Sequence, residues 1–134
     1  MMYVLDTNTL IYYFKGMGQV ADNLLQHPPR EIAIPCIVLY ELGVGLAKSQ
    51  QPDKRRKQLE TLTKLITVLS LGCEEAKAAA EIRANLEAAG TPIGPMDTLI
   101  AGTALANQGI LVTHNTGEFS RVEGLKLVDW FLTQ

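Results

Sequence analysis

The chain has 134 residues, a formal net charge of −2 at pH 7, and hydrophobic residues at 47% of its positions. This length and composition predict a single globular domain over residues 1–134 and exclude wholesale disorder. The small negative charge argues against bulk electrostatic attraction to nucleic acid, but it is compatible with contact to phosphates through bound metal ions.

Apolar runs with strand-like and helical periodicity alternate along the chain. In chain order, we expect a strand at residues 2–5, helices at 10–15 and 18–27, a strand at 31–34, helices at 36–49 and 53–66, a strand at 67–71, helices at 74–90 and 96–107, and strands at 109–113 and 126–129. Cap and turn residues mark several helix ends: Thr7 and Thr9 before the first helix, Gly16 after it, Pro35 just before the third at a position that suits the start of a helix, Asp53 as N-cap of the fourth, and Gly90 as C-terminal cap of the fifth.

No apolar run approaches the roughly 20 residues that a membrane helix needs. The opening residues, MMYVLD, include no basic leader, and Asp6 interrupts their apolar run, so we expect a cytoplasmic protein without membrane association. Cys36 and Cys73 are isolated in the sequence. We expect both to be reduced core cysteines rather than partners in a disulfide or ligands of a zinc site.

The alternation of strands and helices predicts an α/β sandwich around a mainly parallel sheet. In such sheets, ligands bind beyond the carboxyl ends of the strands. Asp6 ends the first predicted strand, and residues 113–115 end the fourth. A functional site is therefore expected where these two strands end.

Four acidic residues interrupt apolar or small-residue sequence: Asp6, Glu41, Asp97 and Glu118. Two carboxylates about 4 Å apart repel by roughly 4 kcal/mol at an effective dielectric near 20, so grouping them is unfavourable without a cation. Mg²⁺ and Mn²⁺ prefer carboxylate and water oxygens and reverse the sign of this interaction. Nearby polar residues are suited to orient the carboxylates or their waters, namely Asn8, Thr9, Thr113 and Asn115.

Each acid also has a purely structural interpretation. Asp6 is a favoured helix N-cap, and Asp97 suits the first turn of a helix whatever its function. Glu41 has no capping role inside its apolar helix, but it fits an exposed polar stripe. Glu118 is unremarkable as an acid in a surface loop. Only the joint placement of the four at strand ends and helix starts favours a metal site.

Four segments together resemble a known family: YVLDTNTLIYY, PCIVLYELGVG, PIGPMDTLIAGTALA and ILVTHNTGEFSRVEGLKLVDW. In this order and approximate spacing, they are similar to the VapC-type toxins of the PIN-domain ribonucleases, over nearly the whole chain. The resemblance implies a three-layer α/β/α sandwich whose acidic cluster binds Mg²⁺ or Mn²⁺ and cleaves RNA. It further implies an endoribonuclease toxin of a type II toxin–antitoxin system, which inhibits translation by cutting tRNA, with initiator tRNA suggested by the most similar members.

Within this resemblance, Asp6, Glu41 and Asp97 match the three core acids. Asp6 and Asp97 are expected to hold the metal, with Glu41 completing its coordination or positioning the attacking water. Many PIN domains have an aspartate at a fourth position, where this chain has Asn115. Glu118 is expected to take that role, as in the N-x-x-E-F form of the family, and this departure puts a second metal ion in doubt.

The resemblance also implies partners: a VapB-like antitoxin that blocks the site, an RNA substrate, and a second copy of the chain in a homodimer or a larger assembly with the antitoxin. Lys15 and Arg121 are candidate RNA contacts, as is the basic run at residues 53–57. His114 stands beside the site but has no visible catalytic partner in the sequence, so we do not expect it to be catalytic.

Two other functions are compatible with parts of this pattern. A phosphatase of the haloacid dehalogenase class also opens with a strand that ends in aspartate, but its D-x-D-x-T motif needs an acid where this chain has Asn8. The other alternative is a catalytically inactive PIN-like module that binds RNA or a protein partner. The retained acids disfavour it, because a chain without metal gains stability by losing them.

Overall fold

Five parallel strands form a single sheet in the computed structural model, which describes residues 1–134. The strands are β1 (Tyr3–Leu5), β2 (Ile32–Pro35), β3 (Thr67–Leu69), β4 (Ile110–Val112) and β5 (Lys126–Val128). Their order across the sheet is β3-β2-β1-β4-β5, and every neighbouring pair is parallel. The mainly parallel sheet expected from the sequence is confirmed, with no antiparallel edge.

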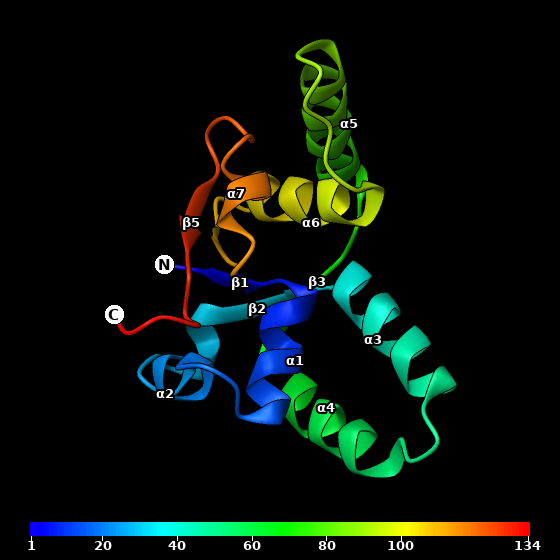
Figure 1. Cartoon of the computed structure of the whole chain (residues 1–134), viewed down its shortest axis with the longest axis vertical. Helices are drawn as coiled ribbons and strands as arrows, with labels where there is room; N and C mark the ends of the chain where they lie inside the picture. Colours follow the sequence, from blue (N-terminus) through cyan, green and yellow to red (C-terminus); the bar gives the residue numbers. More distant parts are fainter.

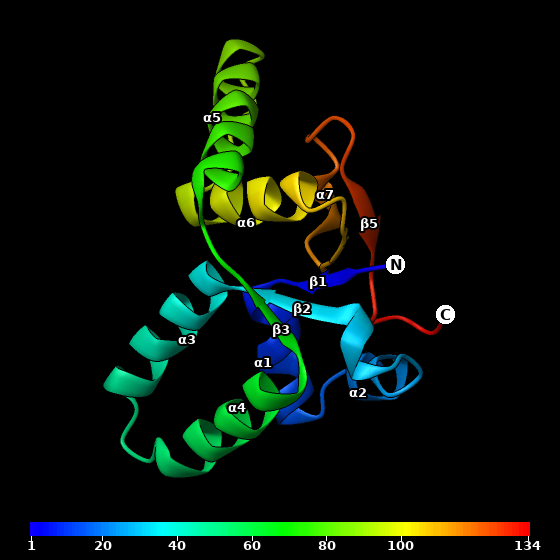
Figure 2. The ribbon, with the colours of Figure 1, turned by 180° about the vertical axis from the view of Figure 1, so that it is seen from behind.

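Helices cover both faces of this sheet and produce three layers. The helical elements are α1 (Thr7–Lys15), α2 (Val20–Leu24), the 3₁₀ turn η1 (Pro29–Glu31), α3 (Cys36–Lys48), α4 (Asp53–Leu65), α5 (Cys73–Ala88), α6 (Pro95–Ala106) and α7 (Thr116–Phe119). Helices α5, α6 and α7 lie on one side of the strands, whereas α1, α2 and α4 lie on the other (Figures 1 and 2). The expected three-layer α/β/α sandwich is confirmed.

The core follows from the burial of the sheet on both faces. Val4, Leu5, Leu111 and Val112 have no exposed surface, which is why β1 and β4 read as continuous apolar runs rather than as alternating patterns. Helix α6 is also largely buried, because α5 crosses it closely on the outside (Figure 1). A Cβ atom at Gly102 would lie 2.7 Å from the backbone of α5, so only glycine allows this approach.

Several expected helix ends differ in detail. Asp6, rather than Thr7 or Thr9, is the N-cap of α1, because its carboxylate accepts a hydrogen bond from the backbone N–H of Thr9. Asp53 is the first residue of α4 rather than its N-cap, and its carboxylate pairs with Arg56 at 3.3 Å. Gly16 ends α1 in the left-handed conformation, as expected.

Other local features also depart from the sequence-based expectations. The short elements η1 and α7 are additional to those expected, whereas Pro35 closes β2 and directly precedes α3, as expected. Gly90 has a φ of +73° just beyond α5 and fulfils its expected role as a terminating residue. Cys36 and Cys73 are free, but Cys73 is exposed at the start of α5, so its expected place in the core is wrong. No helix is both long and apolar enough to cross a membrane.

Candidate active site

The strand order places the end of β1 beside the end of β4. Chain connections lead from β1 toward β2 and β3 on one side, while β4 pairs with β5 on the other. Leu5 is paired with Val112, and the backbone N–H of Asp6 donates to the carbonyl of Val112 at 3.2 Å. Asp6 and Thr113 therefore leave the sheet side by side at the point where strand order reverses, which is where open α/β sheets bind ligands.

Asp6 is a buried carboxylate, only 5% exposed. One oxygen accepts the 2.9 Å hydrogen bond from the N–H of Thr9 that caps α1. Burial raises the pKa of Asp6; the hydroxyl groups of Thr113 and Thr9 and the Thr9 N–H oppose this rise, and the charge of Glu41 adds to it. The same side chain therefore caps α1 and places a buried carboxylate where β1 and β4 end.

Glu41 lies in the middle of α3 and is half-buried, so it does not belong to an exposed polar stripe. The hydroxyl of Thr7 donates to Glu41 Oε1 at 2.6 Å and joins the first turn of α1 to α3. The sequence by itself indicates only a capping role for Thr7. The position of Thr7 directly after Asp6 is the only sequence feature that points to a role in the site. Its partner, Glu41, is 34 residues away, and no local pattern identifies that pairing.

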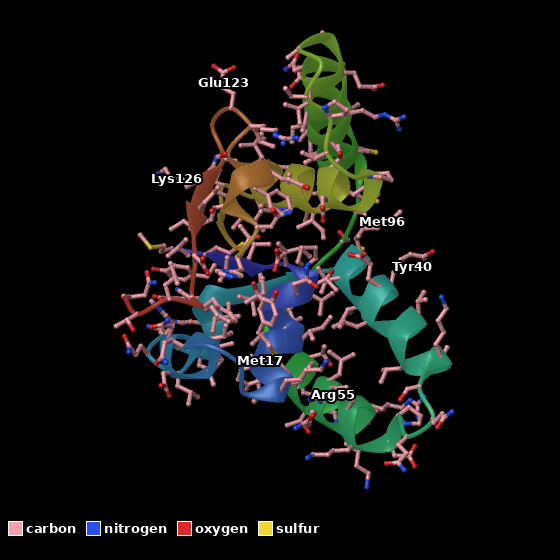
Figure 3. All side chains as sticks on the ribbon, in the orientation of Figure 1. Met17, Tyr40, Arg55, Met96, Glu123 and Lys126 are labelled. Atoms are coloured by element: carbon pink, nitrogen blue, oxygen red, sulfur yellow. The ribbon has the colours of Figure 1, made fainter.

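Asp97 lies in the first turn of α6, as the sequence predicts, and it is half-buried. Burial raises its pKa to about 6, with further increases from the charges of Asp6, Glu118 and Glu41 in that order. Three other acids therefore act on this carboxyl group, although they come from the junction of β1 and α1, from α3 and from α7. Met96 and Tyr40, the neighbours of Asp97 and Glu41, lie on the same side of the molecule (Figure 3).

Glu118 is half-buried in α7 rather than in a loop, and its charge acts on Asp97. Asn115 is exposed at the N-terminus of α7, and its backbone N–H, not its side chain, donates to Thr113 Oγ1 at 3.0 Å. Asn8 is also exposed. Of the residues expected to orient the carboxylates, Thr113 and Thr9 contact Asp6, whereas Asn8 and Asn115 have no side-chain hydrogen bond to any of the acids.

The remaining candidates make contacts of their own. Arg121 is tied to the loop before α6, because its guanidinium donates to the carbonyl of Pro92 at 3.2 Å. His114 Nδ1 lies 2.8 Å from Asp129 Oδ2, so the histidine has a partner that the sequence did not reveal. Lys15, the last residue of α1, lines a groove together with Glu41.

The donor set fits a hard divalent cation that keeps several waters. None of the salt bridges in the structure involves Asp6, Glu41, Asp97 or Glu118, so their charges lack a cationic partner from the protein. No three acidic, histidine or cysteine side chains lie close enough to form a closed metal cage by themselves. Mg²⁺ needs no such cage, because it is typically bound through one or two carboxylates with water and substrate phosphate as the other ligands.

Comparison with known proteins finds similarity over nearly the whole chain. The family model of the PIN domain matches residues 3–125. The chain is 36% identical over 128 residues to the tRNA(fMet)-specific endonuclease VapC of Shigella flexneri, covering 96% of this chain and 97% of that protein. It is 33% identical to ribonuclease VapC2 of Rickettsia felis, covering 97% of this chain and 98% of that protein.

Solved structures of similar proteins share the fold of this chain over nearly its whole length. The DNA-bound VapBC complex of Salmonella typhimurium contains a chain with a TM-score of 0.89 and 34% identity, covering 97% of this chain and 98% of that one. The VapBC2 complex of Rickettsia felis, bound to a promoter DNA fragment, gives a TM-score of 0.87 and 32% identity, covering 97% of this chain and 99% of that one.

Proposed function

The chain belongs to the PIN domain family, and we propose that it is an endoribonuclease, the toxin of a type II toxin–antitoxin system, which depends on Mg²⁺ or Mn²⁺. The observation that carries the proposal is a set of acids where β1 and β4 end: Asp6 is buried there, Glu41 is bound to the adjacent Thr7, their charges and that of Glu118 raise the pKa of Asp97, and none of the four forms a salt bridge. The proposed substrate is tRNA, and initiator tRNA in particular, because the similar proteins of Shigella flexneri and Salmonella typhimurium are named as tRNA(fMet)-specific endonucleases.

In the proposed mechanism, Asp6 and Asp97 hold the metal ion, and Glu41 completes its coordination or positions the attacking water. When bound, Mg²⁺ or Mn²⁺ lowers the pKa of water and stabilises negative charge on a phosphate. The Thr9 N–H fixes one oxygen of Asp6, and the Thr7 hydroxyl fixes one oxygen of Glu41. The second oxygen of Glu41 remains available to accept a hydrogen bond or a proton from water.

Hydrolysis by water predicts products with 5′-phosphate and 3′-hydroxyl ends. Glu118 is proposed to act as the fourth acid, since its charge already acts on Asp97 and the side chain of Asn115 is exposed. Thr113 is proposed to hold the carboxylate of Asp6 in place, because its hydroxyl opposes the rise of that group's pKa.

The proposed partners are a VapB-like antitoxin and a second copy of this chain. The proposed location of the protein is the cytoplasm. Support for the antitoxin comes from the VapBC complexes that contain the similar chains. Support for self-association comes from exposed apolar side chains on α3, where Tyr40 is 60% and Val44 is 40% exposed.

The test is cleavage of total bacterial RNA by the purified, antitoxin-free protein in Mg²⁺, in Mn²⁺ and in EDTA. Asp6→Asn and Asp97→Asn are assayed beside it, with Glu123→Gln as a matched control at an exposed acid (Figure 3). We expect discrete cleavage that requires metal, persists in the control and is lost in both aspartate variants. Cleavage that survives in both variants contradicts the proposed site, and metal-independent RNA binding without cleavage supports the inactive-module alternative.

A further inference from the structure

A groove extends away from the acidic cluster between α1, α3 and α4. Its volume is about 500 Å³, within the range of ligand-binding clefts, and Glu41 is among its lining residues. We propose that this groove binds the single-stranded RNA segment adjoining the phosphate that is cut, through Lys15, Lys54 and Arg55. This inference rests on the proposed function, because it concerns the substrate of the same site.

The charges in the groove favour a polyanion. Three cationic side chains line it, Lys15, Lys54 and Arg55, whereas Glu41 is its only acidic residue. None of the three cations takes part in a salt bridge, so no carboxylate of the protein neutralises their charge; Arg55 donates only to the neutral side chain of Gln58, at 2.7 Å. This local excess of positive charge differs from the whole chain, whose net charge is −2. It also borders a cluster of carboxylates that by itself repels RNA.

The apolar part of the groove favours unpaired nucleotides. The guanidinium carbon of Arg55 lies 5.1 Å from the centre of the Phe14 ring, which joins α4 to α1, and Figure 3 places Arg55 on α4. Ile11, Leu42 and Leu59 also line the groove. A basic groove with aromatic or guanidinium planes for base stacking is the usual arrangement of proteins that bind single-stranded nucleic acid.

A neighbouring groove on α4 provides the contrast. It lies between α1, α2 and α4, and Lys57 is the only charged residue among its lining residues. It does not include any of the four acids of the site. Lys57 is exposed and, like Lys54, has no salt bridge, so it is a matched control on the same helix.

The experiment measures binding of a fluorescein-labelled single-stranded RNA of about ten nucleotides by anisotropy in EDTA, where cleavage is not required for the readout. We expect the Lys54→Ala/Arg55→Ala double variant to bind at least about tenfold more weakly. Its slope of log K against log salt should be shallower by about 1.4, because each cation that neutralises a phosphate of a single strand contributes about 0.7 to the slope. Lys57→Ala should change the affinity by less than about twofold, since it lies outside the groove.

Arg55→Lys keeps the positive charge but removes the guanidinium that packs on Phe14, so it separates the effect of charge on RNA binding from the effect of this packing. A thermal melt of each variant checks folding. Equal weakening by Lys57→Ala and Lys54→Ala overturns the inference, since it indicates bulk charge rather than a groove. Unchanged RNA binding with weakened capture of the co-expressed antitoxin also overturns it, because the groove is then a protein-docking surface. Groove-dependent binding without any cleavage supports the inference while refuting the proposed nuclease.

Discussion

Replacement of Asp97 by asparagine should stabilise the metal-free protein at neutral pH. The carboxyl group of Asp97 has a pKa raised from 3.8 to about 6 by burial and by the charges of Asp6, Glu118 and Glu41. Its ionised form is therefore unfavourable in the folded chain. Asparagine has nearly the same shape but no charge, so the substitution removes the penalty and leaves the packing in place.

The magnitude follows from the size of the pKa shift. A shift of about two units corresponds to at most about 3 kcal/mol, at roughly 1.4 kcal/mol per unit. Asp97 is only half-buried and lies in the first turn of α6, so solvent and the helix dipole reduce the penalty, and we expect about 1–2 kcal/mol. For a chain of 134 residues, this is an increase in Tm of about 4–8 °C.

The effect should depend on pH with a defined sign. Between about pH 4 and pH 6, the folded chain retains the Asp97 proton that the unfolded chain releases. Stability contributed by the protonated group is therefore complete below about pH 4 and is lost as the pH rises through about 6. Asp97→Asn should accordingly match the unsubstituted protein at about pH 4 and exceed it at about pH 7.5.

Urea unfolding followed by circular dichroism, in EDTA and at both pH values, measures this difference. Glu123→Gln is the matched control, and it should change the free energy of unfolding by less than about 0.5 kcal/mol at either pH. Added Mg²⁺ or Mn²⁺ should stabilise the unsubstituted protein more than the variant, because binding to the folded state adds to stability. A variant that is equally or less stable than the unsubstituted protein at neutral pH in EDTA would refute the electrostatic reasoning.

Three further outcomes are expected. Thr7→Val removes the donor to Glu41 and should lower kcat for RNA cleavage by roughly tenfold, with a change in the free energy of unfolding below about 1 kcal/mol. Thr7→Ser keeps the hydroxyl and should retain activity in the same assay, and an unchanged kcat in Thr7→Val contradicts the positioning role. Gly102→Ala should destabilise the chain by about 1–3 kcal/mol in urea unfolding, because its Cβ meets Ala79. Gly43→Ala has open space around it in α3 and should stabilise the chain by about 0.5–1 kcal/mol, so equal effects of the two variants contradict the packing argument. Removal of metal with EDTA should abolish cleavage and excess Mg²⁺ or Mn²⁺ should restore it; full activity in EDTA contradicts metal dependence.

The sequence was sufficient to predict where the strands and the longer helices lie along the chain, because each depends on a pattern within a short window. Apolar runs predicted the first, second and fourth strands, and the mixed segments at 67–71 and 126–129 predicted the other two, the last with the turn at Gly124 before it. Helical periodicity with Gly16 and Gly90 located two helix ends. The acids were visible for a related reason. Asp6, Glu41 and Asp97 interrupt apolar segments, and a charge in such a place is uncommon unless the structure uses it.

Only the tertiary structure decided which groups contact one another. The hydrogen bond from Thr7 to Glu41 joins residues 34 positions apart, and the pair of His114 and Asp129 joins the end of β4 to the segment after β5. The exposure of Cys73 likewise depends on where α5 lies, since it has no signal in the residues around it.

The same division explains the site as a whole. The residue types and their positions at strand ends and helix starts are local properties, so the sequence determined the candidate acids. The raised pKa of Asp97, the burial of Asp6 and the cationic groove beside Glu41 arise because β1, α1, α3, α4, α6 and α7 come together. Such proximity is fixed by packing of the layers on the sheet, and Coulombic and burial effects depend on that distance rather than on separation along the chain.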